Sequence, residues 1–158
     1  MTPIREIKDG AYKTVALYYS KDISAEGSIK FLTPQSYPLQ IGLIEHREGK
    51  SVAPHIHRDL FYDVNTTQEF IYVEKGENIM VTIFDHNWAE IEKLTMSSGD
   101  SILFVSGGHS LDIPAGCRIF EVKQGPYPGD KLAKVFKDWI LWLFQWTSHV
   151  SLRRQRKI

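Results

Sequence analysis

Residues 54–76 read PHIHRDLFYDVNTTQEFIYVEKG, and this stretch decides the fold that the sequence predicts. Alternate residues of a β-strand point to the same face, so His55 and His57 can aim both imidazoles at one point. Two histidines spaced in this way are typical of a metal chelate. Glu69 begins the next apolar run, which ends at the turn Lys75-Gly76-Glu77, and its carboxylate is a third candidate ligand.

A fourth candidate ligand follows from the turn residues downstream. Gly99-Asp100 begins an apolar run that ends at Gly107-Gly108, and this second glycine pair presents His109. Three histidines and one carboxylate leave open coordination positions on an octahedral metal. The set His55, His57, Glu69 and His109 therefore predicts one divalent metal ion, with iron, manganese, nickel or cobalt suited to it and zinc a further candidate.

The rest of the chain up to residue 124 consists of short β-branched and aromatic runs separated by turn residues. Many short strands of this kind predict a closed sandwich or barrel rather than a parallel α/β sheet. The runs expected to be strands are 14–19, 28–32, 39–45, 55–57, 69–73, 79–84, 90–94, 102–105, 110–113 and 118–123. The predicted fold class is therefore all-β.

The last quarter of the chain has a different pattern. Residues 125–129 form a Gly- and Pro-rich break, Asp130 is a candidate helix cap, and apolar residues then recur at helical spacing. We therefore expect a barrel domain over 1–128 and an amphipathic helix with a basic tail over 129–158. The helix is expected to pack on the barrel or on a second subunit, and a helix lying on a membrane surface is the less favoured alternative.

Composition limits the classes of partner. The 19 basic and 19 acidic residues balance, which gives no reason to expect nucleic-acid binding. The chain has one cysteine, its N-terminal residues lack the pattern of a secretory signal, and its longest apolar block is too short to span a bilayer. We expect a cytoplasmic protein with no membrane partner.

The quoted motifs resemble those of the cupin superfamily. The stretch from His55 to Gly76 resembles the first cupin motif, which has two histidines separated by one residue, then a glutamate, then six residues and a glycine. The stretch from Gly99 to His109 resembles the second. The resemblance covers roughly residues 39–124. It implies a double-stranded β-helix, which is a jelly-roll barrel, and a homodimer. The chain departs from the motifs in having eleven residues between His57 and Glu69, where three or four are usual, and Val105 in place of the usual proline. His109 also comes one residue early, and no asparagine follows it at the usual place.

The resemblance implies a metal-dependent enzyme that acts on a small polar molecule. Isomerisation or epimerisation of a sugar or keto acid is one expected chemistry, and dioxygenation is the other. Glu69 would remain a ligand or act as a base, while Glu121 and Lys123 share a strand face and are candidates for acid, base or substrate anchor, or else face solvent. The alternatives are a non-catalytic module that binds a metal and a small molecule, and a metal-free epimerase.

Overall fold

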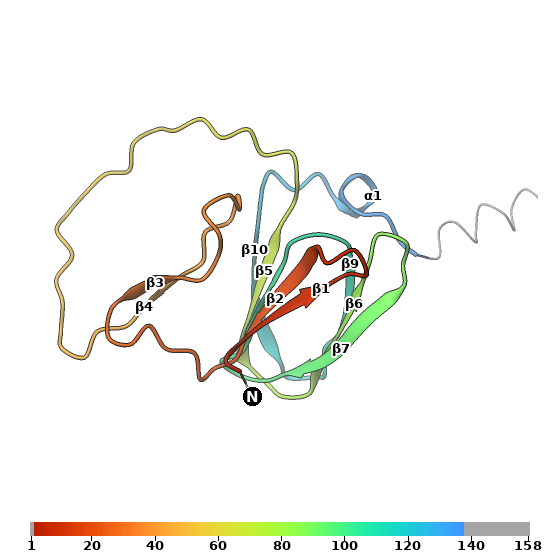
Figure 1. The fold of residues 1–158 in the computed structure, drawn as a ribbon, viewed down its shortest axis with the longest axis horizontal. Coiled ribbons are helices and arrows are strands. Elements are labelled where there is room, and N and C mark those ends of the chain that lie inside the picture. The colour runs from red at the N-terminus through yellow and green to blue at the C-terminus, as the bar shows by residue number, and fades with distance from the viewer. Residues whose placement is uncertain (1, 138–158) are drawn as a thin grey trace, which may run out of the picture. The chain divides into compact units, whose positions relative to one another are not determined.

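The structure, a computed structural model, describes residues 2–137, and its regular secondary structure is almost entirely β-strand (Figure 1). The prediction of an all-β fold is confirmed. The strands are β1 Ile4–Lys8, β2 Thr14–Tyr19, β3 Ile29–Phe31, β4 Gly42–Ile44, β5 Glu69–Lys75, β6 Ile79–Phe84, β7 Glu90–Met96, β8 Ser101–Phe104, β9 Gly108–Asp112 and β10 Arg118–Lys123. Strand β1 has no counterpart among the runs that the sequence predicted.

The strands form three antiparallel sheets. One sheet has five strands in the order β1-β2-β8-β5-β10, a second has three in the order β7-β6-β9, and β3 and β4 make a separate hairpin. Within the part of the chain that the structure describes, these pairings do not close into a barrel. The five-stranded and three-stranded sheets instead face each other across a shared core.

That core is built by alternate residues of strands from both sheets. Ile79, Val81 and Ile83 of β6 are each 0% exposed, and they pack with residues of β2, β5, β7 and β8. A second, smaller cluster gathers Leu17, Tyr19 and Leu103 with apolar residues of the segment 23–41. Strand β2 therefore buries side chains on both of its faces, as its run of buried residues indicates.

Aspartate side chains fix three of the turns between strands. Asp9 accepts backbone N–H bonds from Ala11 and Lys13, and Asp85 does the same in its own turn. Asp100 differs because it is buried and its two carboxylate oxygens bind separate segments, namely the N–H groups of Lys21 and Ser97, each at 2.9 Å. Asp100 thus joins the β7–β8 turn to the segment that follows β2.

Replacing Asp100 with alanine is expected to lower the free energy of unfolding by about 3 kcal/mol, because two partly buried N–H groups lose a charged acceptor. Asp85→Ala is the matched control, since its hydrogen bonds are exposed and water replaces the carboxylate. Its expected cost is about 1 kcal/mol or less. Urea denaturation of both variants measures the difference in the free energy of unfolding. Equal losses of stability would show that the burial of Asp100 adds nothing to its contribution.

The chain divides into two compact units after Gln124. The second unit contains α1, Asp130–Ala133, whose cap is Gly129, so Asp130 is the first helical residue and not the predicted cap. Residues 134–137, which belong to the predicted amphipathic helix, are not helical, and the rest of that helix, from Asp138 to the basic tail, lies outside the described residues. Among residues 2–137, no helix has the length and apolar character needed to cross a bilayer.

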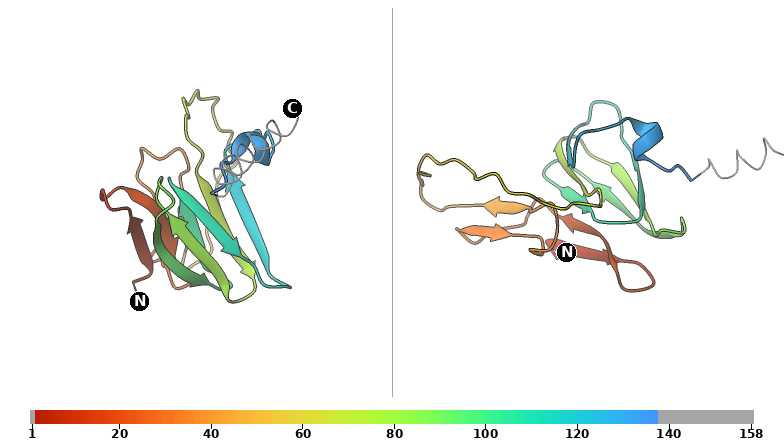
Figure 2. Two further views of the ribbon diagram at one scale, coloured as in Figure 1. Left: turned by 90° about the vertical axis from the view of Figure 1, so that its right-hand side faces the viewer. Right: turned by 90° about the horizontal axis from the view of Figure 1, so that it is seen from above.

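The predicted strand at His55–His57 is wrong. Residues 45–67 instead form a long irregular connection between β4 and the residue before β5, which we call the arch. Every residue of the arch is exposed. Figures 1 and 2 show it projecting from the two sheets, with the β3–β4 hairpin beside it. The arch contains ten of the eleven residues that separate His57 from Glu69, and the eleventh, Gln68, is buried.

Candidate functional site

The candidate site begins with one row of residues across the five-stranded sheet. Glu69, the first residue of β5, lies opposite Phe104 of β8 on one side and Lys123 of β10 on the other. Directly opposite residues of neighbouring strands point to the same face of a sheet. Phe104 belongs to the core between the sheets, so Glu69 and Lys123 also face the three-stranded sheet.

His109 reaches this row from the opposite sheet. It is the second residue of β9 and lies opposite Ile83, which is fully buried on the inner face of β6. The glycine pair before it is required by close packing. Gly107 has φ +69, and a Cβ there would lie 2.4 Å from the carbonyl oxygen of Phe84, while a Cβ on Gly108 would meet the Trp88 ring at 2.9 Å. The predicted role of this turn in presenting His109 agrees with the structure.

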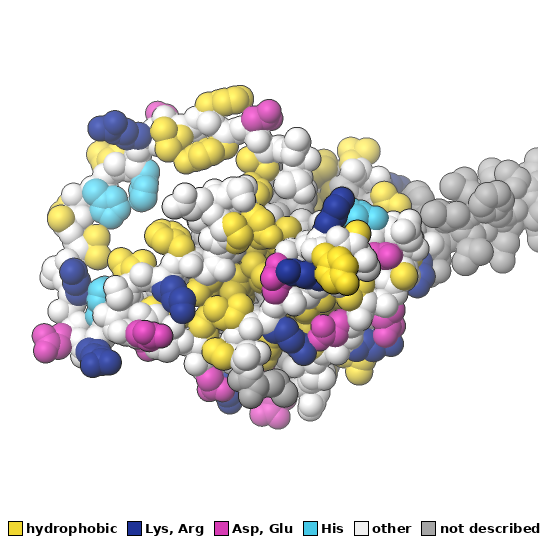
Figure 3. Space-filling model, in the orientation of Figure 1, with side chains coloured by type: hydrophobic (Ala, Val, Ile, Leu, Met, Phe, Trp, Pro, Cys, Tyr) yellow, Lys and Arg dark blue, Asp and Glu magenta, His cyan; other side chains and the backbone are white. Residues whose placement is uncertain are grey.

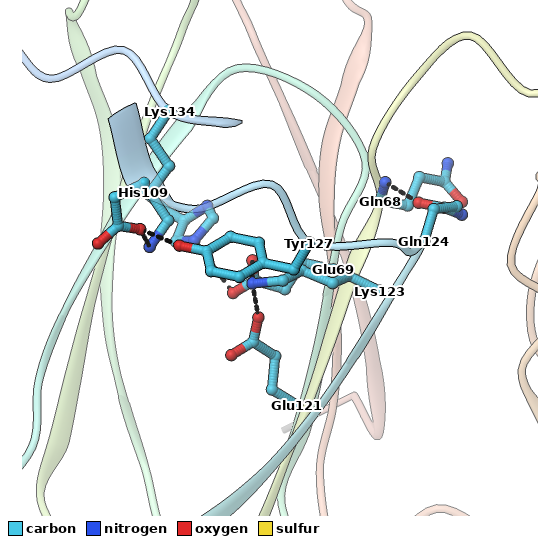
Figure 4. A network of polar contacts seen from close by, with 9 residues as sticks. Gln68, Glu69, His109, Glu121, Lys123, Gln124, Tyr127 and Lys134 are labelled. Carbon is cyan, nitrogen blue, oxygen red and sulfur yellow. Dashed lines mark hydrogen bonds and ion pairs between the residues drawn. The ribbon is translucent and has the colours of Figure 1, made fainter. Parts of the chain in front are cut away.

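The four polar side chains form a contact network (Figure 4). The Nε2 atom of His109 lies 3.4 Å from Oε1 of Glu69, and Nζ of Lys123 lies 3.8 Å from Oε2 of the same carboxylate. Lys123 also forms an ion pair with Glu121, two residues earlier on the same face of β10. The side chain of Glu69 is 15% exposed and that of Lys123 is 21% exposed, so the network lies at the edge of the core.

Two features that sequence reasoning missed hold this network in place. Phe104 stacks on the His109 ring, with centroids 3.8 Å apart and planes 7° from parallel. Gln68, next to Glu69, donates its backbone N–H to the side-chain oxygen of Gln124 at 2.7 Å, and Gln124 follows Lys123. The contact between Gln68 and Gln124 follows from the pairing of β5 with β10, which the sequence does not specify. No sequence pattern indicates that Phe104 stacks on His109.

His55 and His57 lie on the arch and contact each other. Their ring centroids are 5.0 Å apart in an edge-to-face arrangement, and Nδ1 of His55 lies 2.9 Å from the carbonyl oxygen of Ala53. Both side chains are exposed. The structure therefore brings together Glu69, His109, Glu121 and Lys123, but it does not bring the two arch histidines to them.

The candidate metal ligands lie in two separate pairs, Glu69 with His109 and His55 with His57. A carboxylate oxygen and an imidazole nitrogen 3.4 Å apart can bind the same ion after a small adjustment, and two neighbouring imidazoles on the arch are of the right chemistry to complete its coordination. Within residues 2–137 no group of three or more metal-binding side chains is already assembled. Movement of the arch toward the sheets is needed to unite the two pairs.

A shallow surface hollow of about 520 Å³ lies elsewhere. It is lined by Glu26, Gly27, His46, Arg47, Glu48, Gly49 and Lys50, none of which is a predicted site residue. The neighbouring Glu45 is structural: its carboxylate accepts hydrogen bonds from Ser24 and from the N–H of Ala25, and these bonds lower the pKa of Glu45. The candidate site therefore remains at Glu69 and His109.

Comparison of the chain with protein-family models, with curated proteins and with solved structures gave no match. The assignment of a function therefore depends on the residues of this chain and on the geometry described above.

Proposed function

We propose that the protein is a cupin-type jelly roll of the cytoplasm that binds one divalent metal ion and acts on a small polar molecule. The observation that supports this most directly is the contact between Glu69 and His109. These two residues come from different motifs, 40 positions apart in sequence, and they meet where the facing sheets end. A carboxylate and a histidine in contact at the edge of a core are typical of metal centres and of acid–base sites.

His55 and His57 complete the metal site when the arch closes. Twelve peptide units separate His57 from Glu69, and an extended chain spans about 3.3–3.6 Å per residue, so the chain between them can hold His57 at any distance from contact with Glu69 up to about 40 Å. Gln68 is 2% exposed and is bound to Gln124, so the arch is anchored immediately before Glu69. Closure therefore changes the arch and leaves the carboxylate in place.

The neighbouring residues suit a substrate that has acidic or ionisable oxygens. A bound divalent ion would supply Lewis-acid polarisation of such an oxygen, as in the isomerisation or epimerisation of a sugar or keto acid, and iron would also permit dioxygenation. Lys123 offers a cation beside Glu69 to pair with an anionic substrate group. Glu121, the ion-pair partner of Lys123, can take or return a proton at the open edge of the network.

A non-catalytic module that binds a metal and a small molecule is the second candidate. The ion pair between Lys123 and Glu121 favours it, because each group satisfies the other and neither is set apart as an acid or a base. Turnover of a sugar or keto acid by the metal-loaded protein supports the enzyme. Thermal stabilisation by the same compound without turnover supports the module.

The metal content of the purified chain tests the proposal. Protein prepared without chelators or a metal-binding tag is expected to contain about one equivalent of a divalent transition metal per chain, as measured by elemental analysis. His57→Ala is expected to lose most of that metal and to keep its fold, because His57 is exposed and outside the core. His86→Ala is the matched control, since His86 is exposed in the β6–β7 turn, and it should retain the metal.

Full metal occupancy in His57→Ala would remove the arch histidines from the site. A wild-type chain that holds no metal, and takes up none on titration with manganese, cobalt or zinc, would contradict the metal-binding proposal as a whole.

A further inference from the structure

Apolar side chains are exposed in unusual number on the arch and the β3–β4 hairpin. On the hairpin, Ile29, Phe31 and Ile44 are 53%, 66% and 67% exposed, and on the arch, Ile56 and Phe61 are 95% and 94% exposed. Val52, Leu60 and Tyr62 of the arch are also exposed. Figure 3 shows hydrophobic side chains on both sides of the opening between the arch and the hairpin. Single exposed apolar residues are ordinary, but a collection of this size marks an interaction surface.

The hairpin residues form one continuous face. Ile29 of β3 lies directly opposite Ile44 of β4, and Phe31 lies opposite Gly42, so their side chains point to the same side of the hairpin. A Cβ on Gly42 would lie 3.5 Å from the Phe31 ring, which shows that the ring covers the glycine. The result is an apolar surface on one side of the hairpin, formed by Ile29, Ile44 and Phe31.

The backbone of this region also lacks the support that a stable sheet gives. Strands β3 and β4 are three residues each and pair with each other in a sheet of two, so each has a free edge. Isolated two-stranded hairpins are marginally stable in water, and free strand edges can pair with another chain. The 23 residues of the arch are all exposed and contain no strand.

We propose that a second copy of this chain covers the hairpin face and the arch in a symmetric dimer. The available area supports this. Phe31, Phe61 and Tyr62 are 66%, 94% and 71% exposed. An aromatic side chain covers about 150–250 Å², so these three alone expose on the order of 450 Å². Ile29, Ile44, Val52, Ile56 and Leu60 add to this, and a standard interface buries about 800 Å² on each partner.

The charges of the region favour a second copy over other occupants. Arg47, Lys50 and Arg58 are interspersed with Glu45, Glu48, Asp59 and Asp63 on the arch. A two-fold symmetric interface places a surface against itself, and a surface of mixed charge can pair with its own copy whereas one of a single sign would repel it. A nucleic acid or an anionic membrane would instead need an excess of basic residues.

The dimer is tested by sedimentation of the full chain over a range of micromolar concentrations. The wild-type protein is expected to have twice the 18.2 kDa mass of the chain. Phe31→Glu is expected to weaken the association at least a hundredfold, because it places a charge in the centre of the apolar face. Phe61→Glu tests the arch in the same way, and it keeps the test valid if Phe31→Glu fails to fold.

Tyr12→Glu is the matched control, because Tyr12 is 85% exposed in the turn between β1 and β2. It should leave the association unchanged. A wild-type chain that remains monomeric, including one that binds anionic vesicles as a monomer, would overturn the inference. So would a dimer whose dissociation constant is the same in Phe31→Glu, Phe61→Glu and Tyr12→Glu. The inference does not depend on the proposed metal site, since sedimentation reports mass whether or not metal is bound.

Discussion

Replacing Glu69 with glutamine is expected to lower the affinity of the protein for a divalent metal ion by about a hundredfold or more. Changes to residues that only orient metal ligands cost about 10–100-fold, and this variant changes a ligand itself. Glutamine has nearly the same shape as glutamate but no negative charge, so the attraction for the cation is lost while the β5 backbone and its pairing with β10 are kept. Titration calorimetry with manganese, cobalt and zinc measures the affinity.

Glu121→Gln is the control for this experiment. Both carboxylates contact Lys123, but only that of Glu69 lies beside His109. The control variant is therefore expected to bind metal with nearly the wild-type affinity, and a small rise or fall would reflect the altered charge on Lys123. Equal losses of metal affinity in the two variants would mean that the network attracts the ion through its total charge and not through Glu69 as a ligand. Unchanged metal binding in Glu69→Gln would remove Glu69 from the ligand set.

Strand positions could be predicted well where apolar residues alternate between turn residues. The runs at Thr14–Tyr19, Ile79–Phe84 and Arg118–Lys123 were predicted to the residue, because each run ends at a break in the apolar pattern. Strand β1, Ile4–Lys8, was missed because three of its five residues are charged and its two isoleucines do not alternate with them. It lies at the edge of a sheet, and its pairing with β2 is what makes it a strand. Local pattern does not contain that information.

The candidate site was predicted in part for the same reason. Glu69 was predicted to begin a strand and His109 to follow a glycine turn; Glu69 is the first residue of β5, His109 follows Gly107-Gly108, and the fold brings the two side chains into contact. The strand at His55–His57 was wrong, because two histidines around one isoleucine do not bury enough apolar surface to hold a strand in a segment where every neighbour is exposed. The stacking of Phe104 on His109 depends on how the two sheets face each other, which no single run determines.

Strand register explains why a site forms at this place. The row that contains Phe104, Glu69 and Lys123 passes from a core residue to two charged residues within one face of a sheet. Strand β10 is the edge of that sheet, so its end of the row is open to water while the Phe104 end is buried. Glu69 lies between these two environments. Packing against the core holds its carboxylate in position, and the open edge lets a ligand reach it.

Phe104→Ala is expected to lower the free energy of unfolding by about 4 kcal/mol, as is usual for a buried phenylalanine. Phe104 is 4% exposed and belongs to the core between the sheets, so removing the ring leaves a cavity. The same change removes the surface on which His109 stacks. The variant should therefore also bind metal more weakly than the wild type under conditions in which both are folded.

Two further variants separate packing from stacking at this position. Phe104→Leu keeps most of the buried volume and is expected to cost roughly 1–2 kcal/mol, yet it removes the aromatic stacking, so its metal affinity should fall as in Phe104→Ala. Phe120→Ala removes a ring that is 57% exposed on β10 and should change the free energy of unfolding by less than about 1 kcal/mol. If Phe104→Leu binds metal as tightly as the wild type, the stacking has no part in positioning His109, and the ring of Phe104 serves only to fill the core.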